Sequence, residues 1–368
     1  MKARAMVQIA ARRLEMEEFE VPRVGASEGL LRVAACGLCG SDVEQYRGHF
    51  AEKGLAEYPV IPGHEPVGTI EELGADAEAR WGVKAGDRVA LQPVISCGRC
   101  ADCLSGAHHL CKGMFQMASP AYGYLPTTIG HGLWGGYGEY IHLHERTLMH
   151  RLPDNVPDEM ATMYQALAAG IRWAVAVPGA GFSDTVLVMG CGQRGLASVV
   201  ALKAAGVSDI VVTGLKRDAF KLRLAREFGA THTVVADEED TIDRIMEITG
   251  GRGVDIAVDV VPTDTRVIGH AVEVVRPGGT IVVAGVKGGS NMATLDTDRM
   301  VYKELTLKAV FTQGADMYRA GIDLLARNLE HLAPMHTHEM PLEQAERAIQ
   351  MVGGEIPGEE AICISLHP

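Results

Sequence analysis

The chain has 368 residues, a formal net charge of −13 and 47% hydrophobic residues. At roughly 100–200 residues per domain, this length predicts two or three domains. The acidic balance argues against nucleic acid as the main partner, because counterion release needs a basic face. No stretch approaches the roughly 18 apolar residues of a membrane span, and the first residues lack a secretory apolar region. We therefore expect a cytoplasmic protein with no membrane partner.

Short apolar runs bounded by turn residues occupy the first 150 residues, for example at 30–35, 67–71 and 88–91. They predict short antiparallel strands in a barrel-like, loop-rich domain. A proline-punctuated connector follows at 151–158, and then a helical stretch at 159–177.

From residue 184 to about 286, strand-like apolar runs alternate with helical stretches. The expected strands are 185–189, 210–213, 233–236, 255–261 and 280–284, and the expected helices are 193–205, 219–228, 241–249 and 265–275. This alternation predicts an α/β fold with a parallel sheet covered on both faces. Beyond residue 290 it gives way to amphipathic helices at 315–332 and 342–352 and a strand-like run at 361–366.

A glycine-rich turn connects the first strand and helix of this alternation. Gly190-Cys-Gly-Gln-Arg-Gly195 fits G-x-G-x-x-G in the strand–turn–helix context that a dinucleotide-binding loop requires. The glycines allow the backbone to approach a pyrophosphate, and the helix N-terminus supplies donors for it. The alternative is an ordinary glycine turn between strand and helix that binds no cofactor. We expect Gly190, Gly192, Gln193, Arg194 and Gly195 to bind the cofactor.

The next strand ends at Gly214, where NAD enzymes often carry an acid for the ribose hydroxyls. No acid stands there, and Lys216 and Arg217 follow. Two bases at this place favour NADP over NAD, because they can pair with the 2′-phosphate. The alternative is that both are solvated residues of a helical turn that Asp218 caps.

Four cysteines lie within fifteen residues. Their spacing suits a closed tetrahedral zinc site with a structural role, because four thiolates leave no open position. Buried structural thiols and an iron–sulfur cluster are the alternatives. The four are Cys97, Cys100, Cys103 and Cys111.

A second metal site is suggested by Cys39 in one loop and by His64 and Glu65 in another. A thiolate and an imidazole, with an oxygen or amide ligand, leave one position on zinc open for water or substrate.

Together these motifs resemble the medium-chain, zinc-dependent alcohol dehydrogenase family. The matching segments are 37–42, 63–65, 86–89, 97–111, 135–140, 152–156, 190–195 and 276–280. The resemblance implies a GroES-like, β-rich catalytic domain plus a doubly wound Rossmann domain. It implies a first catalytic part at 1–160, an NAD(P)-binding domain at 161–300 and a return to the catalytic domain at 301–368.

Carried over to this chain, the resemblance makes Cys39 and His64 ligands of a catalytic zinc, with Glu65 as a second-shell or alternating carboxylate. Ser41 matches the hydroxyl that passes on the alcohol proton. The third ligand position, usually Cys, Asp or Glu, falls on Gln165, a departure that resembles the sugar dehydrogenase branch. Gln165 either binds zinc or only hydrogen-bonds nearby.

A second departure is Glu44, where related enzymes often carry a proton-relaying histidine. Glu44 either does the same work or is a surface acid. The resemblance also places Val261, Gly285, Val286 and Phe311 near the nicotinamide half of the cofactor.

The expected protein is a homodimeric or homotetrameric NAD(P)-linked oxidoreductase with two zinc ions per chain. It would interconvert a secondary alcohol, polyol or sugar and its carbonyl. The alternatives are a zinc-free-type quinone or enone reductase of the same superfamily, and a noncatalytic zinc- and nucleotide-binding redox sensor.

Overall fold

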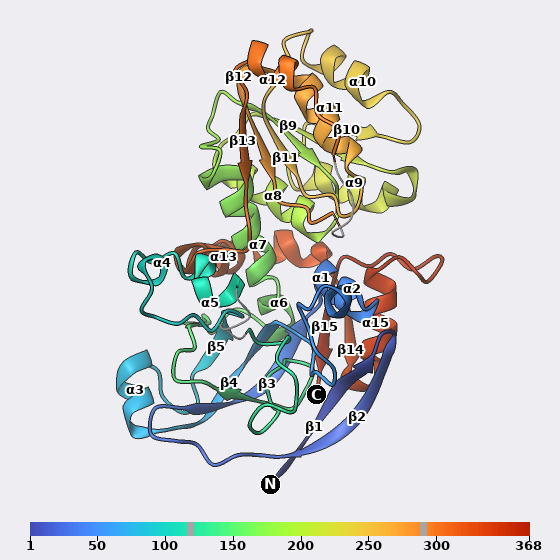
Figure 1. Cartoon of the computed structure of the whole chain (residues 1–368). Coiled ribbons are helices and arrows are strands. Elements are labelled where there is room, and N and C mark those ends of the chain that lie inside the picture. Colours follow the sequence, from blue (N-terminus) through green and yellow to red (C-terminus); the bar gives the residue numbers. More distant parts are fainter. Residues whose placement is uncertain (116–120, 288–292) are drawn as a thin grey trace. The chain divides into compact units, whose positions relative to one another are not determined.

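The computed structural model describes residues 1–115, 121–287 and 293–368 (Figure 1). Contacts divide the chain into two compact units. The first unit contains Met1–Gln165 and Gly314–Pro368, and the second contains Ala166–Gln313. Within these described ranges, no helix is both long enough and apolar enough to cross a membrane.

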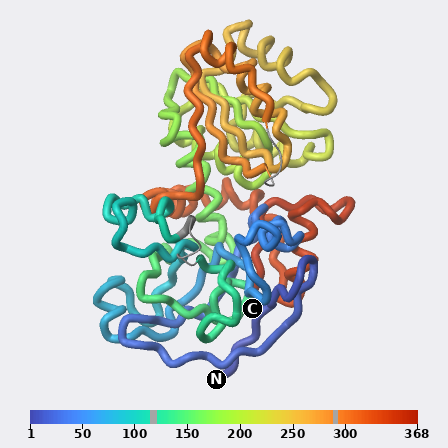
Figure 2. The backbone as a smooth tube through the Cα atoms, viewed as in Figure 1, coloured from blue at the N-terminus to red at the C-terminus, as the bar shows by residue number. Residues whose placement is uncertain are grey.

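The first unit is built on a mixed sheet to which both ends of the chain contribute. Among the described residues this sheet has seven strands, in the order β14-β15-β3-β4-β5-β7 with β6 paired to β3. The strands are β3 (Gly29–Gly37), β4 (Glu65–Leu73), β5 (Arg88–Leu91), β6 (Tyr140–Leu143), β7 (Met149–Arg151), β14 (His336–Pro341) and β15 (Cys363–His367). Figure 2 shows the red C-terminal strand beside blue β3, where Ser365 pairs with Gly37.

Short helices connect these strands. They are α1 (Gly40–Tyr46), α2 (His49–Glu52), α3 (Ala75–Trp81), α4 (Ala101–Leu104), α5 (Lys112–Phe115), α6 (Asp158–Ala161), α13 (Ala315–Arg327), α14 (Leu329–Leu332) and α15 (Ala345–Val352). β3 shows why the sheet forms. Leu31 and Val33 are buried and Arg32 between them is exposed, the alternation of a strand with one face on a core.

The second unit holds a six-stranded parallel sheet in the described residues, in the order β10-β9-β8-β11-β12-β13. Its strands are β8 (Thr185–Met189), β9 (Asp209–Gly214), β10 (His232–Val235), β11 (Val254–Asp259), β12 (Val275–Val283) and β13 (Thr306–Ala309). Its helices are α7 (Tyr164–Gly170), which begins at the end of the first unit, α8 (Gln193–Ala204), α9 (Ala219–Glu227), α10 (Thr241–Ile248), α11 (Arg266–Val274) and α12 (Thr297–Tyr302). When these six strands are numbered 1 to 6 along the chain, their order across the sheet is 3-2-1-4-5-6. This is the doubly wound dinucleotide-binding topology. The expected α/β fold, with a β-rich domain and a parallel Rossmann sheet, is confirmed.

Several stretches differ from the expected elements, and two of them have a clear physical reason. The helix expected at 159–177 is divided into α6, α7 and a π-helical segment, Ile171–Ala176. At Gly170 the chain packs so closely on α8 that an added Cβ would lie 2.4 Å from the Ala197 carbonyl oxygen. The sequence also gave no signal for the hairpin of β1 (Lys2–Ala10) and β2 (Arg13–Glu20), because four glutamates along β2 obscure its apolar positions.

Candidate active site

The ends of β3 and β4 bring together buried side chains of types that bind metals. Gly37, the last residue of β3, pairs with Glu65, the first residue of β4. This register places Cys39, two residues beyond β3, beside His64 and Glu65. One ligand atom from each of these three side chains lies within 4.8 Å of the others, and all three residues are buried. A Cβ at position 37 would lie 2.9 Å from Glu65 Oε2, so a larger residue there would displace this carboxylate.

Asp42 organises this cluster. Its carboxylate accepts a 2.7 Å hydrogen bond from the Cys39 backbone N–H, and its other oxygen lies 3.3 Å from His64 Nδ1. Because Nδ1 faces Asp42, Nε2 is the ring atom that can bind a metal, the carboxylate–histidine arrangement common at zinc sites. Sequence reasoning did not single out Asp42. A weak signal existed, namely an acid in the first turn of the helix that Cys39 begins.

His64 also contacts two hydroxyl groups. Its Nε2 lies 3.2 Å from Ser41 Oγ, and its Nδ1 lies 3.4 Å from the Tyr124 hydroxyl oxygen. Burial lowers the pKa of His64, but Tyr124 and Asp42 outweigh burial and raise the pKa well above its usual value. A metal ion requires the neutral ring, so metal binding should release a proton here.

Gln165, at the start of α7, lies beside the same cluster. Its side chain is buried, and its amide nitrogen donates a 3.3 Å hydrogen bond to the His64 carbonyl oxygen. With the nitrogen turned to this carbonyl, the amide oxygen is the atom that could bind a metal. The sulfur of Cys39 and the imidazole of His64, with either the Glu65 carboxylate or the Gln165 amide oxygen, would make the three-ligand set of an open zinc site.

Glu44 lies one turn after Ser41 on α1. Its carboxylate oxygens contact His49 Nδ1 at 2.7 Å and Arg47 Nη1 at 3.4 Å. Its side chain is 18% exposed. Glu44 is therefore a paired, largely buried acid.

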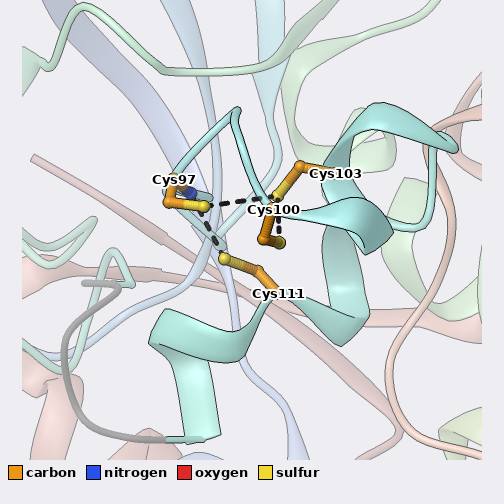
Figure 3. Close-up of side chains that lie close together, drawn as sticks. All are labelled: Cys97, Cys100, Cys103 and Cys111. Atoms are coloured by element: carbon orange, nitrogen blue, oxygen red, sulfur yellow. Dashed lines mark hydrogen bonds between the residues drawn. The ribbon is translucent and has the colours of Figure 1, made fainter.

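The four-cysteine loop forms a separate cluster, and Figure 3 shows its sulfur atoms turned toward a common point. All four lie within 4.8 Å of one another. The Cys100–Cys103 and Cys97–Cys103 sulfur separations are 3.4 and 3.9 Å. Tetrahedral zinc with about 2.3 Å bonds places sulfurs about 3.8 Å apart, so the cluster fits zinc.

Two features of this loop bear on the charge of the thiols. Backbone N–H groups of Cys103 and Lys112 lower the pKa of Cys100. Burial raises the pKa of Cys103 to about 12. A bound cation would reverse that rise by stabilising the thiolate.

The glycine-rich loop lies at the switch point of the parallel sheet, between β8 and β11. Gly190 has a φ of +103°, and an added Cβ would lie 3.1 Å from Val261. A Cβ on Gly195 would lie 2.0 Å from the Gly190 carbonyl oxygen, so the loop and α8 pack closely. At Gly192, the residue before α8, nothing lies within 4 Å of the Cβ position. This open space above a helix N-terminus fits a pyrophosphate. Arg194 lies over the Trp173 ring, 5.5 Å from its centre.

The packing at the end of β9 explains why no acidic residue stands at Gly214. A Cβ on Gly214 would lie 2.6 Å from the Cys191 sulfur and 2.9 Å from Leu222, so a larger side chain does not fit without rearrangement. Of the two bases that follow, Lys216 pairs with Glu238 at 2.5 Å and Arg217 is exposed. No ion pair to Arg217 is present within the described chain.

The residues expected near nicotinamide lie at the carboxyl edge of the same sheet. Gly285 packs on Val261, since an added Cβ would lie 2.3 Å from the Val261 carbonyl oxygen. Val286 and Phe311 are 63% and 44% exposed. Sequence reasoning missed the buried pair beside them, in which Lys287 Nζ lies 2.8 Å from Asp259 Oδ2.

The second unit has a doubly wound dinucleotide-binding sheet. The first, β-rich unit holds an open Cys–His–carboxylate cluster and a closed four-thiol cluster. These features together define a zinc-containing dehydrogenase.

Comparisons with known proteins give the family. Residues 25–154 match the alcohol dehydrogenase GroES-like domain, and residues 195–327 match the zinc-binding dehydrogenase domain. The chain is 41% identical to a protein of Mycobacterium tuberculosis named as a probable alcohol dehydrogenase, covering 99% of this chain and 98% of the relative. It is 30% identical to sorbitol dehydrogenase of Bacillus subtilis, covering 94% and 92% of the two chains. A crystal structure of an alcohol dehydrogenase from Thermotoga maritima superposes over the full length of both chains, with a TM-score of 0.87 and 27% identity. The chain belongs to the zinc-type medium-chain alcohol dehydrogenase family, and it is an oxidoreductase.

Proposed function

We propose that this enzyme oxidises a secondary alcohol or polyol, and reduces the corresponding carbonyl, at the Cys39–His64–Glu65 cluster with NAD(P) as hydride carrier. The observation that carries this proposal is the buried cluster itself, which holds an open zinc donor set with the Ser41 hydroxyl beside it. A zinc-free reductase would have no use for these ligands. A noncatalytic sensor would not need Ser41 and Asp42 arranged around His64.

Zinc bound at this cluster supplies a Lewis acid that lowers the pKa of an alcohol oxygen. The chain contributes the rest of the arrangement. Asp42 holds the His64 ring in place, and Gln165 holds the His64 backbone. Ser41 Oγ accepts the proton of the alcohol and passes it outward, as positioned hydroxyls do in general acid–base catalysis.

A nicotinamide cofactor supplies the hydride acceptor for alcohol oxidation. Gly190, Gly192 and Gly195 give its pyrophosphate access to the backbone of the loop, and Gln193 and Arg194 open the helix that faces it. We infer that two zinc ions bind per chain, one at the catalytic cluster and one at the four cysteines.

The substrate class rests on Gln165 and on the relatives. An amide in place of an ionised third ligand leaves zinc more positive, and the sorbitol dehydrogenase relative acts on a polyol by its name. The test is absorbance of reduced nicotinamide with zinc-loaded enzyme, supplied with sorbitol or with a hydrophobic secondary alcohol, each with NAD and NADP. Turnover of sorbitol supports the hypothesis that the substrate is a polyol. Turnover of the hydrophobic alcohol alone restricts the proposal to secondary alcohols, and no turnover of either contradicts it.

We expect Gln165→Ala to lower zinc affinity at the catalytic cluster by about tenfold or more, the scale seen when a ligand or its support is removed. Gln165→Glu is the matched control, because it keeps an oxygen donor at the same place and should retain zinc. Zinc content is measured after dialysis against a graded chelator. Unchanged metal content and rate in Gln165→Ala would remove this residue from the site.

We infer a preference for NADP, carried by Arg217 in particular. We expect Arg217→Ala to raise the KM for NADP by about tenfold, the scale of a lost charge-assisted hydrogen bond, with little change for NAD. Lys216→Ala is the comparison and should have a smaller effect, because Glu238 already pairs with this ammonium. The measurement is KM for both cofactors with each variant. Equal losses for NAD and NADP would contradict the preference.

We infer that the enzyme assembles from two or four copies. β13 is an edge strand of the second unit, and all four of its residues are exposed. Val301 and Tyr302 beside it are 71% and 83% exposed. A second copy could cover such an edge, and the molar mass in solution tests this.

A further inference from the structure

Three polar side chains, those of Ser41, Glu44 and His49, follow one another along α1 and α2 away from the catalytic cluster. Ser41 lies 3.2 Å from His64, and Glu44 follows one helical turn later on the same face. Glu44 Oε2 lies 2.7 Å from His49 Nδ1 on α2. The exposed fraction rises along this path, from 18% for the Glu44 side chain to 41% for His49. Of the Glu44–His49 pair, the imidazole is therefore the more exposed member.

Other charged groups fix the orientation of this pair. Arg47 Nη1 lies 3.4 Å from the second Glu44 oxygen, while Arg47 Nη2 donates to Glu355 at 2.8 Å. Glu355 also accepts hydrogen bonds from Arg12. The Glu44 carboxylate is thus held between a histidine and an arginine that is itself anchored.

The remaining charged groups on the adjoining elements point to other partners or are exposed. Glu346 on α15 accepts a 2.6 Å hydrogen bond from the Tyr46 hydroxyl. Arg347 pairs with Glu359, and Glu52 is an exposed residue of α2. Arg47 is therefore the charged side chain, among those described, that contacts the Glu44–His49 pair directly.

We propose that His49 is the group through which this enzyme exchanges the alcohol proton with solvent, acting through Glu44, and that Arg47 is a positioning residue for that pair. This proposal rests on the dehydrogenase function proposed above. Oxidation of an alcohol removes a hydride and a proton, and the proton must leave the buried site. Ser41 receives this proton and passes it across one helical turn to the Glu44–His49 pair, which becomes a carboxylate–imidazolium pair. The exposed ring then gives a proton to water, so the pair returns to its starting state.

The residue types suit this task. A carboxylate alone is a weak base at neutral pH, whereas an imidazole exchanges protons with water in the physiological range. A neighbouring carboxylate stabilises the imidazolium that forms, and the Arg47 contact keeps that carboxylate facing the ring.

The test compares His49→Gln with His232→Gln, a substitution of a partly exposed histidine on β10 far from this pair in the sequence. For alcohol oxidation near pH 7 we expect His49→Gln to lower kcat by about tenfold, less than a directly acting acid or base contributes, with KM unchanged. The deficit should shrink as pH rises, because hydroxide then removes the proton, and added imidazole should restore the rate. A pH profile and kcat equal to those of His232→Gln would overturn the proposal. Loss of kcat that neither imidazole nor high pH restores would also overturn it, because it would show a structural role.

A second measurement needs no turnover. In the zinc-loaded enzyme, the nitrogen-15 signals of the His49 ring should move with Glu44→Gln and with Arg47→Ala. They should stay in place with Glu52→Gln, which removes an exposed carboxylate from the helix that carries His49. If Glu44→Gln leaves the His49 signals unchanged, the pair does not form and the proposal is wrong even if the enzyme is an active dehydrogenase. If wild-type enzyme oxidises no alcohol while these signals respond as expected, the proposed function fails and the pairing itself stands.

Discussion

Cys39→Ser should lower turnover by at least about a thousandfold, the scale on which loss of a central electrostatic or metal contribution acts. Serine replaces a thiolate with a hydroxyl that stays protonated and binds zinc poorly. The fold should survive, because Cys39 precedes α1 as its N-cap residue and serine is a favourable N-cap. The Asp42 carboxylate would still accept the backbone hydrogen bond at this position. Turnover, zinc content and the melting temperature are measured together.

Cys36→Ala is the matched control for this variant. Cys36 is also buried and lies three residues earlier, but its sulfur belongs to the apolar core and not to the metal-binding cluster. We expect Cys36→Ala to keep both its zinc and most of its activity. If Cys39→Ser retained full activity, or if both variants lost activity equally, the catalytic zinc at this cluster would be ruled out.

Cys103→Ser should act on stability more than on chemistry. Cys103 is buried beside the sulfurs of Cys97 and Cys100, and a serine there removes one of four thiolates from a closed site. Because metal binding is coupled to folding of such loops, we expect zinc to leave the four-cysteine cluster. The melting temperature should fall by about 5–10 °C, corresponding to a few kcal/mol in a chain of this size.

The control for Cys103→Ser is Leu104→Ser on the same short helix, where the side chain is 76% exposed. It should leave zinc content and melting temperature unchanged. The structural assignment is wrong if Cys103→Ser keeps two zinc ions per chain and its melting temperature.

The parts of the fold that could be predicted from sequence are those whose signals are local. The strand expected at 185–189 is β8 with the same bounds, because its apolar run reflects burial on both faces of a parallel sheet. The glycines of the proposed cofactor loop are likewise local signals, because a φ of +103° favours glycine at Gly190 and the close approach of the backbone requires it at Gly195. The β1–β2 hairpin gave no such signal, because its exposed face is highly charged.

The residues of the candidate site also differ in whether the sequence alone could identify them. Side chains with distinctive chemistry, such as Cys39, His64 and the four clustered cysteines, could be selected from their types and spacing. Asp42 could not, because an acid early in a helix usually caps it, and only the fold shows its carboxylate turned to His64. The ion pair of Lys216 with Glu238 could not be predicted either, because Glu238 lies beyond the next strand, twenty-two residues later.

The sequence by itself therefore determined the class of fold, the glycine-rich loop proposed to receive a dinucleotide, and the side chains able to hold zinc. These depend on residue type and on short spacing. The tertiary structure decided how those side chains work together. The β3–β4 register brings Cys39 to His64, the packing of Gly214 on Cys191 leaves no room for an acid, and the contact of α1 with α2 joins Glu44 to His49. Each of these depends on contacts between segments separated along the chain, or on side-chain directions that a linear pattern does not contain.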